Sequence, residues 1–576
     1  MNSHYEKRPV VKLSSSSRDC AVGWRSVVER LRERRGRILC VECYPGTFVE
    51  QLEKAIVEGL RPAEVVRASD CLKPPDEINA LLAPYLGDDP VFGRMNGLTL
   101  ADFFDSSRLA KRREAIVKSR GDVLVVGTGA ALLAPDAETL VYADLARWEI
   151  QKRQRSGEIP NLGALNGHER PSLKYKRAFF VDWRVADRLK KKLLPKADFL
   201  LDTNDRRTPK LIPGDLFRHS LKTAVQRPFR VVPYFDPGPW GGEWMRRHFD
   251  LPLDAPNYAW CFDCVPEENS LLLGFGEVEV EVPSIDLVFA YPRELLGEAV
   301  HGRFGAEFPI RFDMLDTMEG GNLSLQVHPL TEYIQEQFGM HYTQDESYYL
   351  LDAGEGATVY LGLKEGVNPA LMLAALEEAE SGGSPFPADK FVNQWPASKH
   401  DHFLIPAGTI HCSGKNCMVL EISATPYIFT FKLWDWGRVG LDGEPRPTHL
   451  AHGRESIQWD RTTTWVRNHL VNRAQCVDSS AAWREERTGL HEREFIETRR
   501  HWFTGEVPHD THGGINVLNL VEGSEVLVES PKDSFEPLVV HYAETFIVPA
   551  AVGRYNIRPM QPGRCATIKA YVRTNP

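Results

Sequence analysis

The chain has 576 residues, of which 42% are hydrophobic and 26% charged, a globular composition that excludes a chain disordered along most of its length. This length exceeds one ordinary hydrophobic core, so we expect about three to five domains. The 69 Lys and Arg residues and the 79 Asp and Glu residues give a net charge of −10, which argues against nucleic acid as a partner.

The N-terminus has no apolar segment typical of a signal peptide. No stretch approaches the ~18 apolar residues of a membrane span, so we expect no membrane partner. Two CxxC pairs, Cys40 with Cys43 and Cys261 with Cys264, lie too far apart in the sequence for a zinc ribbon. They also lie in apolar strand-like segments. We therefore expect buried free thiols and a cytoplasmic protein.

The pattern of apolar, polar, proline and glycine residues predicts three folded blocks after a flexible tail at 1–22. Residues 23–215 alternate apolar strands with helices, which favours a parallel α/β sheet. Residues 216–458 are richer in Pro and Gly and have short alternating strands, which favours an all-β domain interrupted by one helix after Asn368. Residues 459–576 begin with a polar stretch that is hard to assign and then return to short strands. The fold class is therefore multidomain α/β plus all-β.

In the first block, a strand, a Gly-containing turn and a helix follow one another around Glu42–Phe48. A working P-loop needs a first glycine and a lysine that this turn lacks. The wider block resembles the uridine kinase type of P-loop kinase, through Asp89–Gly93, Gly127–Ala130 and Tyr142–Asp144. The resemblance implies a degenerate kinase-like domain, either a scaffold or a site for a nucleotide. A nearby basic group could bind an anion or form a solvated face: Arg147, Arg153, Lys174, Lys176 and Arg177.

The second block contains residue types that suit a divalent metal. Gln326 and His328 lie two apart in a strand-like segment and so point to one face. Glu346 opens a later strand, and His411 follows a turn shaped by proline and glycine. Imidazole, carboxylate and amide oxygen suit Zn²⁺, and also Fe²⁺ or Mn²⁺. Either histidine alone is equally typical of a buried, hydrogen-bonded residue, but the joint order is the cupin pattern.

At these residues the chain resembles class I mannose-6-phosphate isomerase, a zinc-dependent two-cupin family. The matching segments are Pro239–Gly242, Leu323–Pro329, Asp345–Tyr349, Pro406–His411, Trp434–Gly443 and Glu544–Ala550. The resemblance implies two cupin β-barrels (jelly rolls) and one Zn²⁺ per chain. Its ligands would be Gln326, His328, Glu346 and His411. The last block lacks a second ligand set, which implies a structural cupin or one that forms a homodimer.

Aldose–ketose isomerisation needs an acid or base and cations for the sugar phosphate. Gln344 and Asp313 stand where the family has lysines. By the resemblance, Lys432 keeps the charge of a family arginine and Arg438 matches another. Arg311 would share a strand face with Asp313 and could substitute, and Glu421 could act as a base. Lys364 and Lys415 are further candidates, each equally typical of an exposed charge.

The sequence thus predicts a metal-dependent isomerase that interconverts mannose 6-phosphate and fructose 6-phosphate through a cis-enediol. The alternative is a non-catalytic sensor of sugar phosphates or nucleotides that keeps the fold and the metal. The lysines missing from both sites motivate that alternative. A cupin with oxygenase chemistry is disfavoured by Gln326, because such sites usually have more histidine.

Overall fold

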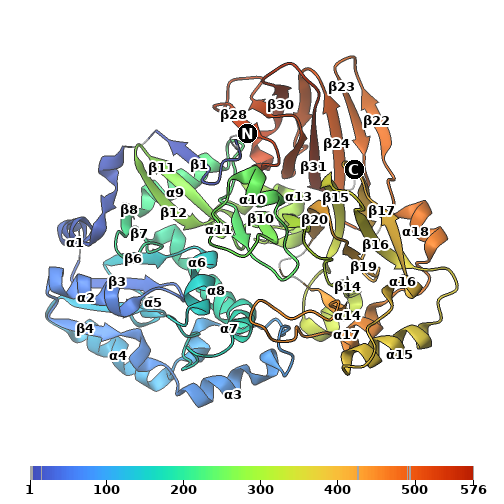
Figure 1. Cartoon of the computed structure of the whole chain (residues 1–576). Helices are drawn as coiled ribbons and strands as arrows, with labels where there is room; N and C mark the ends of the chain where they lie inside the picture. The colour runs from blue at the N-terminus through green and yellow to red at the C-terminus, as the bar shows by residue number, and fades with distance from the viewer. Residues whose placement is uncertain are drawn as a thin grey trace. The chain divides into compact units, whose positions relative to one another are not determined.

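The computed structural model describes residues 4–14, 16–34, 36–424, 427, 429–489, 491 and 494–574. The chain forms two units (Figure 1). The first, here the N-terminal unit, contains Val10–Ala224 and Ser270–Tyr291. The second, the C-terminal unit, contains Met1–Pro9, Val225–Asn269 and Pro292–Pro576. Helices and strands alternate in the first unit and β-sheets dominate the second, so the protein is mixed α/β with many sheets.

The N-terminal unit is organised by one seven-stranded sheet. Its order is β2 (Ala21–Val22), β8 (Lys210–Pro213), β7 (Phe199–Asp202), β6 (Thr139–Asp144), β3 (Ile38–Cys43), β5 (Val123–Gly127) and β4 (Glu64–Arg67). The five strands from β7 to β4 are parallel, as predicted. β3, β5, β6 and β7 are buried along their whole length, which is why they read as continuous apolar runs.

Helices supply the second half of each strand–helix repeat in this unit. They are α1 (Gly23–Arg34), α2 (Val49–Leu60), α3 (Pro75–Leu86), α4 (Ser106–Lys118), α5 (Ala130–Leu133), α6 (Arg147–Arg155), α7 (Pro171–Arg177), α8 (Trp183–Leu193), α9 (Gly214–Ala224) and α11 (Ile285–Ala290). Leu31 of α1 and Leu52 and Ile56 of α2 pack with Val41 and Val126 of the sheet in one apolar core.

A buried ionic cluster lies at the carboxyl end of this sheet. The ammonium of Lys190 is 2.7 Å from Asp144 at the end of β6 and 2.6 Å from Asp286 of α11. All three side chains are at most 1% exposed. Burial lowers the pKa of Lys190, but the carboxylates outweigh it and the pKa is raised. Lys190 therefore neutralises two carboxylates that could not both stay charged without it.

The basic group predicted in this unit is neither a solvated face nor an open anion site. All five of its side chains are buried. Arg147 lies 2.5 Å from the carboxylate of Asp187, and Arg153 donates to the carbonyls of Gly46 and Thr203 at 2.9 and 2.8 Å. Sequence periodicity could not show this, because the partners come from other elements.

The predicted flexible tail at 1–22 is wrong for its second half. Residues of β1 (Val10–Leu13) pair in parallel with β11 (Ser270–Phe275), which also pairs with β12 (Val278–Pro283). Backbone hydrogen bonding to a strand 260 residues away orders a segment that is polar in sequence. The same sheet brings residues 270–291 into the N-terminal unit, although the sequence places them in the block 216–458.

The C-terminal unit begins with two antiparallel sheets. One has the order β18 (His402–Ile405), β15 (Asp345–Ala353), β20 (Cys417–Ala424), β13 (Arg311–Asp316), β10 (Trp260–Cys264) and β9 (Tyr234–Asp236). The other has the order β17 (Val392–Pro396), β16 (Thr358–Leu363), β19 (His411–Ser413), β14 (Leu325–Val327) and β21 (Phe431–Trp434). We call these the six-stranded and the five-stranded sheet.

Two further antiparallel sheets follow in the same unit. One has the order β22 (Gln475–Ser479), β23 (Trp483–Arg487), β24 (Ile496–Phe503), β31 (Cys565–Val572), β26 (Asn516–Glu522) and β29 (Thr545–Val548). The other has the order β25 (Val507–Asp510), β30 (Arg554–Pro559), β27 (Glu525–Glu529) and β28 (Leu538–His541). Their facing apolar side chains, such as Leu518, Phe546 and Ile557, form one core. The stretch that was hard to assign supplies the edge strand β22 and its neighbours β23 and β24.

The expectation of a single helix in the block 216–458 is wrong. The predicted helix exists as α15 (Pro369–Glu380), and the Asn368 side chain accepts hydrogen bonds from its first backbone amides. The unit also contains α10 (Trp244–Phe249), α12 (Pro292–Leu296), α13 (Glu298–Phe304), α14 (Thr331–Phe338), α16 (Ala388–Phe391), α17 (Leu450–Ser456) and α18 (Thr463–His469). Most have eight residues or fewer, too short for a clear 3.6-residue period.

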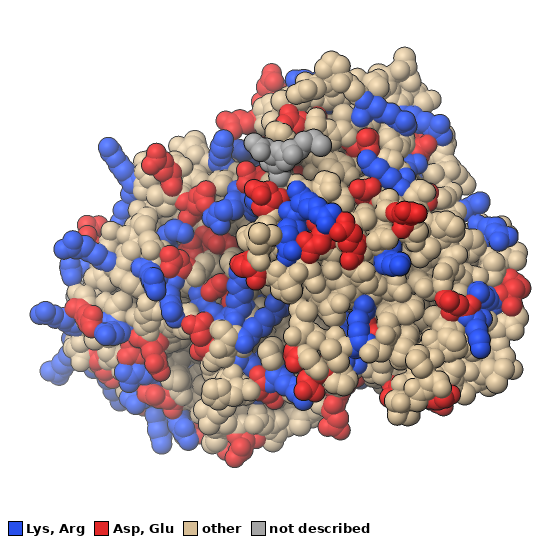
Figure 2. All heavy atoms as spheres, in the orientation of Figure 1, with Lys and Arg blue, Asp and Glu red and all other residues tan. Residues whose placement is uncertain are grey.

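The distribution of surface charge agrees with the composition, and the state of the cysteines matches what the sequence predicts. On the face drawn in Figure 2, Lys and Arg side chains lie interspersed with Asp and Glu side chains. Cys40, Cys43, Cys261 and Cys264 are buried and free, as predicted. Within the described ranges, every helix is too short or too polar to cross a membrane.

We expect Lys190→Met to destabilise the N-terminal unit by about 3–5 kcal/mol near neutral pH, because two buried carboxylates lose their counter-charge. Burial already raises the pKa of Asp286, and loss of Lys190, which opposes that rise, would raise it further. The folded state would bind more protons, so the stability of the variant would rise as the pH falls. Hydrogen exchange of the β6 amides at two pH values measures this. Lys192→Met, an exposed position on the same helix, is the control. Equal protection of β6 in both variants would contradict the assigned role.

Candidate metal centre

Two sheets present the predicted ligands. Gln326 of β14 lies directly opposite His411 of β19 on the five-stranded sheet, so the two side chains share a face. His328 follows β14 two residues after Gln326 and is therefore on the same side. Glu346 comes from β15 of the six-stranded sheet. The site thus joins one carboxylate from the six-stranded sheet to two histidines and an amide from the five-stranded sheet.

The carboxylate of Glu346 lies between the two imidazoles. Its Oε2 is 3.0 Å from His328 Nε2, and its Oε1 is 2.9 Å from His411 Nε2. The side-chain amide of Gln326 is 3.2 Å from His411 Nε2. One ligand atom from each of the three ionisable residues lies within 4.8 Å of the others. Rotation of the amide by 180° would place the oxygen of Gln326 at the same position.

The backbone decides which ring nitrogen faces the carboxylate. His328 Nδ1 is 2.8 Å from the carbonyl of Phe429, and His411 Nδ1 is 2.8 Å from the carbonyl of Thr409. Each Nδ1 therefore donates, and each neutral ring directs the lone pair of its Nε2 toward Glu346. Within the described part of the chain, His328 Nε2 and Glu346 Oε1 are buried without a hydrogen-bond partner. A divalent cation would satisfy these facing lone pairs.

The electrostatics of Glu346 favour its charged form. Burial raises the pKa of Glu346, but the positive charge that His328 and His411 carry when protonated outweighs burial, and the pKa lies well below its usual value. An ionised carboxylate with two Nε2 atoms and an amide is a donor set that suits Zn²⁺, Fe²⁺ or Mn²⁺.

Gln344 has a role that its place in the sequence did not suggest. Its amide donates to Glu346 Oε2 at 2.9 Å, and its oxygen accepts from the backbone amide of Phe429 at 2.9 Å. It therefore orients the carboxylate and links it to the backbone of Phe429, whose carbonyl also accepts from His328. The signal was the spacing of two residues on one strand, which puts Gln344 and Glu346 on the same face.

On the six-stranded sheet, Glu421 of β20 lies opposite Asp313 of β13 and opposite Tyr348 of β15. Arg311 donates to Asp313 from Nε at 3.2 Å and from Nη2 at 2.9 Å. Arg311 and Asp313 thus share a face with Glu421, as expected. The charge of Arg311 is compensated by the aspartate that stands at the family's lysine position.

Burial raises the pKa values of two carboxyl groups on this face, Glu421 and Asp313. Burial, followed by the charges of Glu346 and Asp313, raises the pKa of Glu421 well above its ordinary value. Burial also raises the pKa of Asp313 to about 6, although Arg311 opposes it. A carboxyl group with a raised pKa can accept and release a proton near neutral pH.

Lys432 of β21 lies directly opposite Gln326, so it projects from the face that carries the candidate ligands, and it is partly buried. Arg438 is bound by its own neighbours: Nη2 and Nε lie 2.6 and 3.0 Å from Asp435, and Nη1 donates to the carbonyl of Asn322 at 2.5 Å. Arg446 binds the same aspartate at 2.8 Å and was missed by the sequence reasoning.

The remaining candidates are surface charges. Lys364 and Lys415 are exposed, and the ammonium of Lys364 donates to the carbonyl of Asp389. Glu494 is a residue that no motif indicated. Both of its carboxylate oxygens are buried without a hydrogen bond among the described residues, and burial raises its pKa well above the usual value. Asp345 and Glu346 add to this rise, which places Glu494 near the metal centre.

Comparisons with known proteins gave two kinds of match. Residues 23–226 match the family described as "Domain of unknown function (DUF8485)". The chain is also 29% identical over 213 residues to the mannose-6-phosphate isomerase of Streptococcus mutans serotype c. That match spans 37% of this chain and 61% of the relative's length. The mannose-6-phosphate isomerase ManA of Bacillus subtilis is 24% identical over 257 residues, which is 44% of this chain and 73% of the relative.

The structure of a Bacillus subtilis mannose 6-phosphate isomerase aligns with 60% of this chain and 100% of its own, with a TM-score of 0.50 and 19% identity. At that identity the likeness concerns the fold. The resemblance to mannose-6-phosphate isomerases is confirmed by these matches. The kinase-like interpretation of residues 23–215 stays a prediction, because the matching family carries no described function.

We expect His411→Ala to lose most of the bound divalent metal, because one Nε2 ligand and its contact with Glu346 disappear. Metal stoichiometry by plasma mass spectrometry after zinc loading and desalting measures this. His452→Ala removes a histidine of α17 whose ring is hydrogen-bonded to Tyr333 and should keep the metal. Retention of full stoichiometry by His411→Ala would refute its role as a ligand.

Proposed function

We propose that this chain is a metal-dependent aldose–ketose isomerase that interconverts mannose 6-phosphate and fructose 6-phosphate. The observation that carries the proposal is the buried cluster of His328, Glu346 and His411. It lies in a chain that is similar to mannose-6-phosphate isomerases in sequence and fold. Gln326 would be the fourth ligand, and Zn²⁺ the metal, one per chain.

A bound Zn²⁺ would supply Lewis-acid stabilisation of the charge that develops on the sugar oxygens. Glu421 is the residue that could move the proton between C1 and C2, because its raised pKa lets it carry a proton near neutral pH. Lys432 would bind the phosphate or polarise O1 and O2 from the opposite sheet. Arg438 would act beside it, oriented by Asp435, and Arg311 would position Glu421 through Asp313.

The proposed architecture is finer than two units. We assign residues 216–458 to a catalytic cupin barrel and 459–576 to a second cupin without metal, which could form a homodimer. Residues 23–215 would be a kinase-like scaffold. Arg153 holds the carbonyl of Gly46 in the turn where a P-loop would cradle phosphate, which supports a scaffold over a nucleotide site. A cytoplasmic location fits a sugar-phosphate substrate.

Zinc-loaded protein should convert mannose 6-phosphate to fructose 6-phosphate in a coupled assay, and a chelator should abolish turnover until zinc is restored. His411→Ala should be inactive. The two hypotheses differ in one result. Absence of turnover by fully metallated protein that still binds mannose 6-phosphate calorimetrically would refute the isomerase and favour the sugar-phosphate sensor.

Lys432→Met should lower kcat/KM by about 10²-fold, the usual cost of removing one stabilising donor from an active site. Metal content should stay unchanged, because Lys432 is not a proposed ligand. Lys415→Met removes an exposed lysine of the same unit and should have no effect. Equal kcat/KM values for the two variants would exclude Lys432 from the site.

A further inference from the structure

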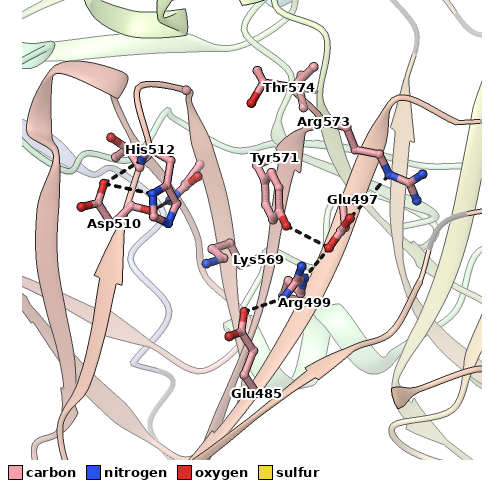
Figure 3. Close-up of a pocket in the computed structure, with 13 residues that line it drawn as sticks. Glu485, Glu497, Arg499, Asp510, His512, Lys569, Tyr571, Arg573 and Thr574 are labelled. Atoms are coloured by element: carbon pink, nitrogen blue, oxygen red, sulfur yellow. Dashed lines mark hydrogen bonds and ion pairs between the residues drawn. The ribbon is translucent and has the colours of Figure 1, made fainter. Parts of the chain in front are cut away.

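A cavity in the C-terminal unit is lined by residues that do not belong to the metal cluster. Its volume is about 530 Å³, within the range of small-molecule sites. Strands β24, β25 and β31 contribute most of its lining, together with the turn that contains Thr511 and His512. Figure 3 shows Lys569 of β31 extending into the space between Arg499 and the turn that carries Asp510 and His512.

Lys569 is the unusual residue of this cavity. It is 8% exposed, yet its ammonium has no hydrogen bond and no ion pair within 4 Å among the described residues. The ring of Tyr571 lies beside it, with its centroid 5.6 Å from the ammonium. A largely buried lysine whose ammonium has no counter-ion is costly to the folded state.

Arg499, Glu485 and Glu497, which also line the cavity, already form ion pairs with other residues. Arg499 is paired with Glu485 at 3.2 Å and also with Glu497, which accepts a hydrogen bond from Tyr571 at 2.9 Å. Glu485 also lies 3.3 Å from His501. These groups leave the charge of Lys569 uncompensated. The charged or titratable groups that face it are Glu485, Glu497, Arg499, His501, His509 and Asp510.

The two histidines near Lys569 are also without hydrogen-bond partners of their own. His501 Nδ1 and both ring nitrogens of His509 are buried without a hydrogen-bond partner in the described part of the chain. Burial lowers the pKa of Lys569 to about 8, although Glu485 opposes the shift. With that pKa, Lys569 is still mostly protonated, and therefore positively charged, at neutral pH.

We propose that this cavity binds a small hydroxylated anion, whose anionic group pairs with Lys569 and whose hydroxyl groups bond to the carboxylates of Glu485 and Asp510. A sugar phosphate and a sugar acid share this chemistry. The site does not depend on the isomerase reaction, since it uses none of the metal ligands and none of the proposed catalytic side chains.

Acylation of Lys569 in the full chain tests the proposal. The protein is treated with a small acetylating ester, and the rate at Lys569 is followed by peptide mass spectrometry, with exposed Lys532 of the same unit as internal reference. The probes are mannose 6-phosphate, gluconate and mannitol. We expect mannose 6-phosphate or gluconate to slow acetylation of Lys569 at least tenfold, with Lys532 unchanged and mannitol without effect.

The two anions separate the sources: protection by the phosphate ester alone indicates a sugar phosphate, and protection by gluconate alone a sugar acid. The His411→Ala background removes binding at the metal centre from the measurement. Failure of both anions to protect Lys569 in that background, or equal protection by mannitol, overturns the proposal.

Lys569→Met supplies an independent test. Its melting temperature should equal or exceed that of the parent, because an unpaired buried charge is removed, and its metal content should be unchanged. Calorimetric binding of the protecting anion in the His411→Ala background should disappear. Binding that persists in Lys569→Met overturns the proposal. Loss of isomerase activity in the parent protein would bear on the proposed function and leave this result intact.

Discussion

The buried contact of one carboxylate with two imidazoles fixes the geometry of the candidate metal centre. Glu346 belongs to the six-stranded sheet, whereas His411, Gln326 and the segment leading to His328 belong to the five-stranded sheet. Two neutral rings that direct lone pairs at a carboxylate repel it unless a cation lies between them. Metal binding and the facing of the two sheets are therefore one energetic event.

Hydrogen bonds around the cluster are what make that geometry specific. The carbonyls of Phe429 and Thr409 set the tautomer of each ring, and Gln344 ties the carboxylate to the backbone of Phe429. Gln344, at a position where the family resemblance predicts a lysine, therefore orients the carboxylate of Glu346 without adding a positive charge.

Part of the site could be predicted because it depends on spacing. Gln326 and His328 share a strand face, and so do Arg311 and Asp313, and both pairs behave as expected. The close contact between Arg438 and Asp435 could not be predicted, because it depends on how the chain turns after β21. The sequence could not single out Glu494 for the same reason, because the charges that act on it, Asp345 and Glu346, belong to β15, a strand that is distant in sequence.

The fold shows the same division between local and distant information. Continuous apolar runs predicted the parallel strands of the N-terminal unit correctly, because strands buried on both faces have no polar alternation. β1 is a short strand within a polar segment, and it is ordered by pairing with β11 and by burial of Val11. β11 and β12 have the composition of the strands that follow them, and distant contacts such as pairing with β1 and the hydrogen bond from Glu281 to Asp202 place them in the other unit.

A net charge of −10 says little about which anions this protein can bind, because most buried cations are already paired within the chain. Lys190 neutralises two aspartates, Arg230 lies 2.6 Å from Glu544, and Arg311 is bound to Asp313. What attracts an anion is the positive charge that internal carboxylates do not cancel. In the C-terminal unit the proposed metal between His328 and His411 would meet that condition, and Lys569 would meet it separately. The two proposed sites would then follow from one electrostatic rule, applied once with a bound metal cation and once with a lysine.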